Sequence, residues 1–414
     1  MSDQSPELQP GRDADPLEGS GPTVATRLTQ HLQGGGVIAA LVTIVVAFAA
    51  GGVAVALTGH DPWSTYKAIF NGSGLNWLIP WSSDRELSAI NLQQTLLIAT
   101  PLALLGLAVA YAFRAGLFNI GGQGQYIVGA VIAVWVGGAF DGLPGWLHIV
   151  LAMVAGSVAG GAWAGIAGLL RATTGANEVI TTIMLNWIAI WVGVYLFSLG
   201  GPLQDPGQPD VPISKDIAAN AHLPVFWGDP ELQGLHIGMF IALAAGVVFW
   251  IILHRSTRGY EARAVGLNPE AARASGINVG ATYVRVMFLC GIFAGLAGTI
   301  DVLGWQFHLN TNDIQTTQLG FLGIAVALLG RNTAIGTFLA ALLFGALVNG
   351  TSVRNLDPDV FEPDLAGYLT TIIQGLVVLL ATIDVFVVVL WKRIINRRRP
   401  GAGPVVADAA EGAA

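Results

Sequence analysis

Charged residues are scarce in this chain of 414 residues, where Asp, Glu, Lys and Arg together make up 11%. A soluble domain of this size carries about 25%. Hydrophobic residues reach 53%, and the mean hydropathy is +0.63. Runs such as "VIAALVTIVVAFAAGGVAVAL" (37–57) are long enough for a spanning helix, which needs ~20 mainly apolar residues. These numbers exclude a large soluble domain and predict an all-α integral membrane protein.

Cysteine is almost absent, and Cys290 alone provides neither a disulfide framework nor a thiolate metal site. The seven histidines show no metal-ligand spacing, and no Ser/His/Asp or Cys/His nucleophile set is suggested. The only lysines are Lys67, Lys215 and Lys392, and none follows a phosphate-binding glycine loop. We therefore expect no metal, no cofactor bound by this chain, no catalytic residue and no enzymatic activity.

Ten hydrophobic segments follow one another between two polar tails. The eighth is too short to span a bilayer unaided, which predicts a broken or partly re-entrant helix there. We expect disordered cytoplasmic tails at 1–35 and 392–414 and a transmembrane domain over 36–391. The segments are 37–58, 90–113, 120–140, 147–170, 179–199, 235–254, 283–303, 318–330, 333–350 and 367–391.

The basic residues are sorted to one side of this predicted arrangement. With a cytoplasmic N-terminus, 15 of the 19 Lys and Arg residues fall inside, and Lys67, Arg85, Lys215 and Arg354 fall outside. Cytoplasmic loops are enriched in Lys and Arg, so both termini are predicted to be cytoplasmic. Segments two to five and seven to ten then have opposite topologies, as in the inverted repeats of many transporters.

Small residues are spaced for close helix packing. Gly156 and Gly160, and Gly291 and Gly295, lie four residues apart, a spacing that lets helix backbones approach closely. We interpret these glycines as packing faces and not as ligand sites.

The longest cytoplasmic loop, 255–282, contains the signals of one short helix. Asn268 can cap it, Pro269 suits its first position, Glu270 favours the positive end of its dipole, and Gly276 can end it. Between them lie mostly alanines, which leave a narrow surface suited to the groove of another protein. An ordinary interfacial connector is the alternative interpretation.

Polar side chains inside the hydrophobic segments are few, and such residues commonly mark a solute path. The stretch "LFNIGGQGQY" (117–126) supplies Asn119, Gln123 and Gln125, and the fifth segment supplies Asn186. Amides both donate and accept hydrogen bonds, which suits a neutral hydroxylated or heterocyclic solute. For Asn186 and Asp384 a simple hydrogen bond between helices is the favoured alternative interpretation. Further candidates are Asn177, Glu178, Asp301, Gln306, His308, Asn310 and Asp384.

Four motifs in order carry a family resemblance over about residues 36–391. They resemble the permease subunits of ABC importers of the branched-chain and simple-sugar type, particularly the nucleoside and simple-sugar subgroup. The motifs are "RAGLFNIGGQGQ" (114–125), "ANEVITTIMLNWIA" (176–189), "GLNPEAARASGI" (266–277) and "LGFLGIAVALLGRN" (319–332).

The resemblance implies a non-catalytic transport subunit with the type II importer fold in a bacterial cell membrane. Its partners would be an ATPase subunit that uses ATP, a second permease subunit, often non-identical, and an extracytoplasmic solute-binding protein received by the loops 59–89 and 200–234. The resemblance also implies that the loop helix couples to the ATPase through Asn268, Glu270, Ala271, Ala272, Arg273 and Gly276.

Asn119 and Gln125 match the family motif, so the resemblance implies a pathway role most directly for these two residues. Gln123 departs from the motif, because related permeases commonly carry an acid at that position. The predicted function is import of nucleosides or related simple sugars, and the sequence does not separate these two substrates. The alternative is a secondary transporter driven by an ion gradient. That mechanism needs a carboxylate relay inside the membrane, for which only Asp301 and Asp384 are available.

Overall fold

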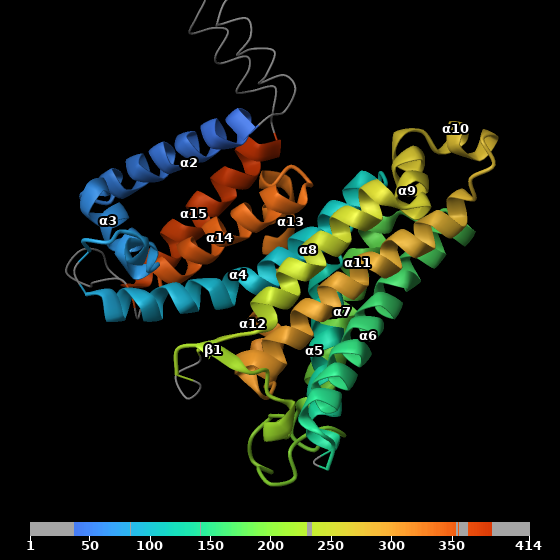
Figure 1. Ribbon diagram of the computed structural model, residues 1–414, viewed down its shortest axis with the longest axis horizontal. Helices are drawn as coiled ribbons and strands as arrows, with labels where there is room; N and C mark the ends of the chain where they lie inside the picture. The colour runs from blue at the N-terminus through green and yellow to red at the C-terminus, as the bar shows by residue number, and fades with distance from the viewer. Residues whose placement is uncertain are drawn as a thin grey trace, which may run out of the picture. The chain divides into compact units, whose positions relative to one another are not determined.

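The computed structural model describes residues 37–82, 84–140, 142–229, 234–352, 355 and 363–382. The two predicted tails and Asp384 lie outside them. Residues 43–382 form one compact unit, in which helices predominate (Figure 1). The first half contains α2 (Val37–Leu57), α3 (Pro62–Gly72), η1 (Leu75–Leu78), α4 (Arg85–Arg114), α5 (Gly122–Ala139), α6 (Gly145–Thr174) and α7 (Glu178–Phe197).

The second half begins with a small irregular region and continues with helices to the last described residue. Its elements are η2 (Ala219–Ala221), β1 (Val225–Trp227), β2 (Leu235–His236), α8 (Gly238–Arg255), α9 (Thr257–Leu267), α10 (Pro269–Ala274), α11 (Val279–Asp301), the π-helical turn η4 (Val302–Gln306), α12 (Thr311–Thr316), α13 (Leu319–Leu329), α14 (Ala334–Gly350) and α15 (Pro363–Thr382).

Membrane-crossing length is reached by five described helices: α4, α6, α7, α8 and α11 continued through η4. The apolar part of α2 and α3 would make a sixth span, although the two helices meet at an angle of 118°. The chain is therefore a helical, multi-pass membrane protein, as its composition predicts. The count of ten spans and the inverted repeat stay predictions.

Two of the long helices occupy the centre of the unit. In the most apolar window of α4, 83% of the residues are buried, and the value for α11 with η4 is 78%. The corresponding values for α6, α7 and α8 are 33%, 28% and 33%, and the exposed side chains there are mostly large and apolar. Because lipid is as apolar as a leucine side chain, α4 and α11 form the core, and the other three present a face to lipid.

The predicted eighth segment, 318–330, is a broken helix, as its length suggests. Asn310 caps α12 by accepting a hydrogen bond from the Asp313 amide at 2.8 Å, and α12 ends at Thr317, whose backbone is extended. After this break, α13 has only 11 residues, or about 16 Å at 1.5 Å per residue. Neither helix can cross a bilayer core of ~30 Å.

Helix α3 lies in a region that the sequence analysis treated as an external loop. Asp61 caps it by accepting a hydrogen bond from the Ser64 amide at 2.9 Å, and Pro62 occupies its first turn. Ile69 and Gly72 are buried against the end of α14, where a Cβ on Gly72 would lie 2.9 Å from the Gly350 carbonyl oxygen. The start signals of Asp and Pro are present in the sequence, but the helix is short and amphipathic, so hydropathy alone misses it.

A short antiparallel hairpin of β1 and β2 precedes α8 and buries His236, which is 1% exposed. The amide of Gly238 donates a hydrogen bond to the His236 Nδ1 at 3.1 Å. Gly304 in η4 makes room for the ring, because a Cβ there would lie 2.1 Å from its Nε2. The imidazole is thus enclosed in its neutral form.

Replacement of His236 by Gln should make the protein less sensitive to mild acid. Burial lowers the pKa of His236 to about 4, whereas a solvated histidine has a pKa near 6.5. Between these values the unfolded chain binds a proton that the folded chain does not, so stability falls as the pH drops from about 6.5 towards 4. At pH 5 this loss is about 2 kcal/mol. Melting temperatures in detergent at pH 7.5 and 5.0 measure it, and an equal decrease in wild type and variant would contradict the assignment.

Candidate functional site

The residues Leu117–Ile120 are not helical and lead into α5 at its first turn. The Oδ1 of Asn119 accepts a hydrogen bond from the Gly121 amide at 2.9 Å, which fixes the turn. The side chains of Asn119 and Gln125 bind each other twice, with N–O distances of 3.1 and 2.9 Å. Both are buried, at 0% and 1% exposure. Their amides are therefore satisfied within the protein.

Gln123 joins α5 to the break between α12 and α13. Its Nε2 donates to the Thr317 carbonyl oxygen at 2.8 Å, and its Oε1 accepts from the Gly320 amide at 2.9 Å. An ionised carboxylate could accept from Gly320 but could not donate to Thr317. The amide at position 123 therefore satisfies both backbone groups of this break, which an ionised acid at this position could not do.

Asn186 of α7 makes the same kind of bridge from the other side. Its Oδ1 accepts from the Gly124 amide at 2.8 Å, and its Nδ2 donates to the Ile120 carbonyl oxygen at 2.9 Å. The interpretation of Asn186 as a bond between helices thus has a defined geometry. We call Asn119, Gln123, Gln125 and Asn186 the amide cluster. The structure brings these four predicted pathway residues together around one turn of backbone, and their contact with solute stays a prediction.

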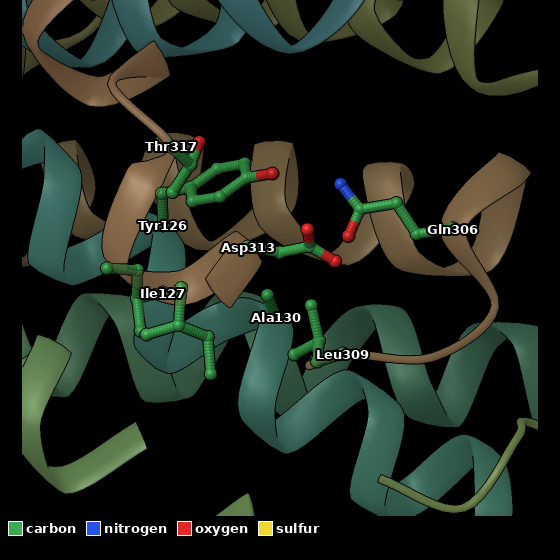
Figure 2. A pocket seen from close by; sticks show the side chains of 8 residues that line it. Tyr126, Ile127, Ala130, Gln306, Leu309, Asp313 and Thr317 are labelled. Carbon is green, nitrogen blue, oxygen red and sulfur yellow. The ribbon is translucent and has the colours of Figure 1, made fainter. Parts of the chain in front are cut away.

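A small cavity with both apolar and polar lining residues lies beside the amide cluster (Figure 2). Tyr126 and Ala130 of α5 line one wall, and Gln306, Asp313 and Thr317 line the other. Its volume is about 30 Å³, which is enough for about one water molecule. Pockets for organic ligands typically measure ~300–1,000 Å³, so the cavity is too small to hold an organic solute.

Asp301, near the end of α11, is held by three donors beside this cavity. It accepts hydrogen bonds from the Tyr126 hydroxyl, from the Trp305 Nε1 at 2.5 Å and from the Gln306 Nε2 at 3.3 Å. The π-helical turn brings Trp305 and Gln306 back over the carboxylate, and such turns are frequent at functional sites. The Oε1 of Gln306 is buried without a partner among the described residues. The sequence singles out Asp301 and Gln306 because they are polar. It does not single out Tyr126, because a tyrosine in an apolar segment is usually part of the core.

The other polar candidates lie apart from the cavity. Glu178 pairs with Arg171 at 3.5 Å. His308 lies 3.0 Å from Asp216 in the irregular region. In the described part of the chain no three His, Cys, Asp or Glu side chains are grouped so that they could hold a metal ion.

The loop 255–282 contains α9 as well as the predicted short helix α10. Asn268 caps α10 by accepting from the Glu270 and Ala271 amides at 2.9 and 3.0 Å. Gly276 follows its end with a φ of +84°, which only glycine adopts without strain. The predicted start and end of this helix are thus confirmed, whereas α9 was not predicted.

Side-chain exposure divides α10 into two faces. Ala272 is 4% exposed and packs with Val265 and Val279, which fixes α10 on its support. Glu270, Ala271 and Arg273 are exposed. Beside them Leu267, the last residue of α9, is 89% exposed. A wholly exposed leucine next to an alanine-rich helix is an apolar contact point that the sequence analysis did not identify.

The basic loops gather at one end of the unit. Arg114 at the end of α4 donates its Nε to the Asn332 carbonyl oxygen between α13 and α14, at 3.1 Å. Arg171 near the end of α6 lies over the Tyr283 ring of α11, 5.9 Å from its centroid. The hairpin and the loops before it lie at the other ends of these helices (Figure 1). The fold therefore separates one basic end from one end rich in loops.

Long apolar helices, a broken helix and buried amides around an interrupted backbone define a multi-pass membrane transport protein. The comparison with known families makes the class specific: the chain belongs to the family of branched-chain amino acid transport system permease components, whose model matches residues 91–382.

Several curated relatives resemble most of the chain. The guanosine ABC transporter permease protein NupP of Bacillus subtilis is 40% identical over 310 residues, which cover 75% of this chain and 84% of the relative. The nucleoside ABC transporter permease protein NupB of Lactococcus lactis is 34% identical, with 81% and 89% covered. The glucose ABC transporter permease protein TsgB13 of Haloferax volcanii is 35% identical, with 82% and 85% covered. No solved structure matches the chain.

Proposed function

We propose that this chain is the permease subunit of an ATP-driven importer that moves nucleosides into the cell. The observation that supports nucleosides as the substrate is the similarity to a nucleoside permease and a guanosine permease. They are 34% and 40% identical to this chain over most of their length. A glucose permease is similarly related, so simple sugars are the second candidate. An ion-driven mechanism is not favoured, because the relatives are ABC permeases.

The proposed assembly contains an ATPase subunit that binds and hydrolyses ATP, a second permease subunit and a solute-binding protein. The chain would span the membrane ten times in the type II importer arrangement, with α5, the α12–α13 pair, α14 and α15 adding to the longer spans. The basic end would face the cytoplasm with both termini, and the end with the hairpin would face the binding protein. Gathering of Arg114, Arg171 and α9 at one end supports this orientation.

We further infer that solute passes along the cavity wall formed by α5 and the α12–α13 break. The amide cluster would hold this wall in place, because its hydrogen bonds satisfy backbone groups where the helices are interrupted. Irregular backbone is tolerated at membrane depth where it lines a protein-walled cavity. The narrow cavity of about 30 Å³ then corresponds to a closed path, and opening requires a movement of α12 relative to α5.

Coupling to the ATPase is assigned to the exposed face of α10 and to Leu267. Asn268 and Gly276 would fix the two ends of α10, and the buried Ala272 would hold it against its support. The predicted coupling residues are Asn268, Glu270, Ala271, Ala272, Arg273 and Gly276. Glu270 and Arg273 are placed for polar contacts, and Leu267 is placed to enter an apolar pocket of the ATPase. A short rigid helix transmits movement because its position is fixed at both ends.

Replacement of Leu267 by Asp should uncouple ATP hydrolysis from uptake. The side chain is 89% exposed, so the folded permease should tolerate the change, while a buried charge at the interface with the ATPase costs several kcal/mol. We expect uptake into proteoliposomes to fall by about tenfold or more, with hydrolysis no longer stimulated by the loaded binding protein. Leu267→Met, which keeps the apolar volume, is the control. Intact coupling in Leu267→Asp and in the double variant Glu270→Ala/Gly276→Val would contradict the assignment.

The substrate is tested on the partner binding protein and the assembled importer together. Guanosine should raise the melting temperature of the binding protein and should be taken up by ATP-loaded proteoliposomes without an ion gradient. Glucose in place of guanosine in both assays would assign the second substrate. Uptake that follows a proton gradient in the absence of ATP would overturn the importer itself.

A further inference from the structure

A second cavity lies away from the amide cluster, among α3, η1 and the start of α4. Its volume is about 750 Å³, within the ~300–1,000 Å³ of pockets that bind organic ligands. It is open to one side and is roughly 25 times larger than the cavity beside Asp301. A nucleoside fits a space of this size.

Side-chain amides dominate its polar lining. Asn71, Asn76, Asn91 and Asn355 contribute to the walls, together with the hydroxyl of Ser88. Each amide offers a donor and an acceptor, as ribose hydroxyls and the edges of a base require. One lysine and one aspartate also line the cavity, so it carries no formal net charge. The lining therefore suits a neutral polar solute better than an ion.

One acceptor in this lining is unused. The Nδ2 of Asn76 donates to the Ser82 hydroxyl at 3.4 Å, but its Oδ1 is buried with no partner among the described residues. A buried carbonyl oxygen without a hydrogen bond is costly, at roughly 1–3 kcal/mol. The oxygen has almost no exposed surface, so a solute that donates a hydroxyl or amino hydrogen removes this cost only when the Asn76 side chain turns towards the cavity.

Aromatic surface completes the chemistry. Trp81 is 86% exposed and Phe70 is 39% exposed, and both line the cavity. Neighbouring Trp77 is fixed, with its ring 5.2 Å from Trp227 and the Arg85 guanidinium 5.6 Å from its centroid. The segment that carries Trp81 is thus anchored, while the Trp81 ring remains accessible for stacking on a planar base.

The floor of the cavity is preorganised by Asn349 of α14. Its Nδ2 donates to the Asn91 carbonyl oxygen at 2.7 Å and to the Thr95 Oγ1 at 3.1 Å. Its Oδ1 accepts from the Asn355 Nδ2 at 2.9 Å. This network fixes the side chain of Asn355 and the backbone of Asn91, so one of the four lining asparagine side chains is held before a ligand binds.

The geometry points to this cavity as a receiving site for the transported nucleoside, outside the membrane core and ahead of the narrow path. We call it the outer asparagine cavity. The inference rests on the proposed function, because the start of α4 faces the binding protein only in the orientation proposed above. Amides would bind the ribose and the base edges, and Trp81 would stack on the base.

Photolabelling with 8-azidoguanosine tests the inference on the permease–ATPase complex in nanodiscs, without the binding protein. We expect label within residues 67–91, displaced by excess guanosine. Trp81→Ala and Asn71→Leu should each reduce the displaceable label about fivefold or more, as loss of base stacking does. Trp146→Ala is the matched control, because that tryptophan is 71% exposed and does not line the cavity.

Two outcomes separate this inference from the proposed function. If wild-type proteoliposomes take up guanosine but the label lies elsewhere, or is unchanged in both cavity variants, the receiving site is wrong and the function stands. If the binding protein and the proteoliposomes ignore guanosine, the proposed substrate is wrong. Both variants alter exposed side chains, so their folded yield should match that of wild type.

Discussion

Replacement of Gly160 by Leu should abolish the folded permease. A Cβ at this position of α6 would lie 2.6 Å from the Gly291 carbonyl oxygen and 2.7 Å from the Gly295 Cα. It would also lie 3.0 Å from the Gln125 carbonyl oxygen of α5. These atoms are backbone and cannot rotate away. Overpacking against side chains that can move already costs ~1–3 kcal/mol, and pushing three helices apart costs more. The free energy of unfolding of a folded protein is only ~5–15 kcal/mol.

The matched control is Gly165→Leu in the same helix. The nearest atom to a Cβ there is the Phe288 Cδ2 at 3.8 Å, an ordinary contact with a side chain that can move. Size-exclusion chromatography of fluorescent fusion proteins in mild detergent compares the two variants. We expect a single symmetric peak for Gly165→Leu and aggregate for Gly160→Leu. A monodisperse Gly160→Leu protein with the melting temperature of wild type would show that the close approach of α6 and α11 is not required.

Replacement of Asn186 by Leu should be the most damaging single change in the amide cluster. It removes both bonds that hold the turn before α5, leaving the Gly124 N–H and the Ile120 carbonyl oxygen buried without partners. Each orphaned group costs roughly 1–3 kcal/mol, and no water in the bilayer core can replace the lost partner. We expect a fall in melting temperature and in the yield of folded protein.

The control for this change is Met184→Leu, because Met184 lies on the same helix and is 52% exposed. Kinetics of the remaining folded Asn186→Leu protein distinguish two roles of Asn186. If Asn186 only holds the turn, uptake per folded molecule should show an unchanged preference between guanosine and glucose. If it contacts solute, that preference should change while stability stays near that of wild type. The second result would contradict the structural role.

Much of the membrane class and local structure follows from the sequence. Composition predicts a helical membrane protein, the eighth segment is too short to span, and the residues from Asn268 to Gly276 mark both ends of α10. These predictions succeed because hydropathy and helix caps act over a few neighbouring residues. Helix α3 is missed, since it is short and only one of its faces is buried.

Candidate site residues were predictable by type but not by role. The sequence selects Asn119, Gln123, Gln125 and Asn186 because amides inside hydrophobic segments are unusual. It does not reveal that Asn119 and Gln125 bind each other, or that Asn186 holds the turn before α5. Nor does it place Tyr126 against Asp301, because an aromatic residue in an apolar helix is usually part of the core.

The sequence by itself determined that this chain is a helical membrane protein with a capped helix in one of its loops, because those properties depend on composition and on short-range hydrogen bonds. The tertiary structure decided which amides are satisfied, and where the small cavity beside Asp301 and the larger outer asparagine cavity lie. Gln123 finds its partners at Thr317 and Gly320, and Asn349 reaches Asn91. Such partners are separated by 194 to 258 residues, and only the packing of complete helices brings them within hydrogen-bonding distance.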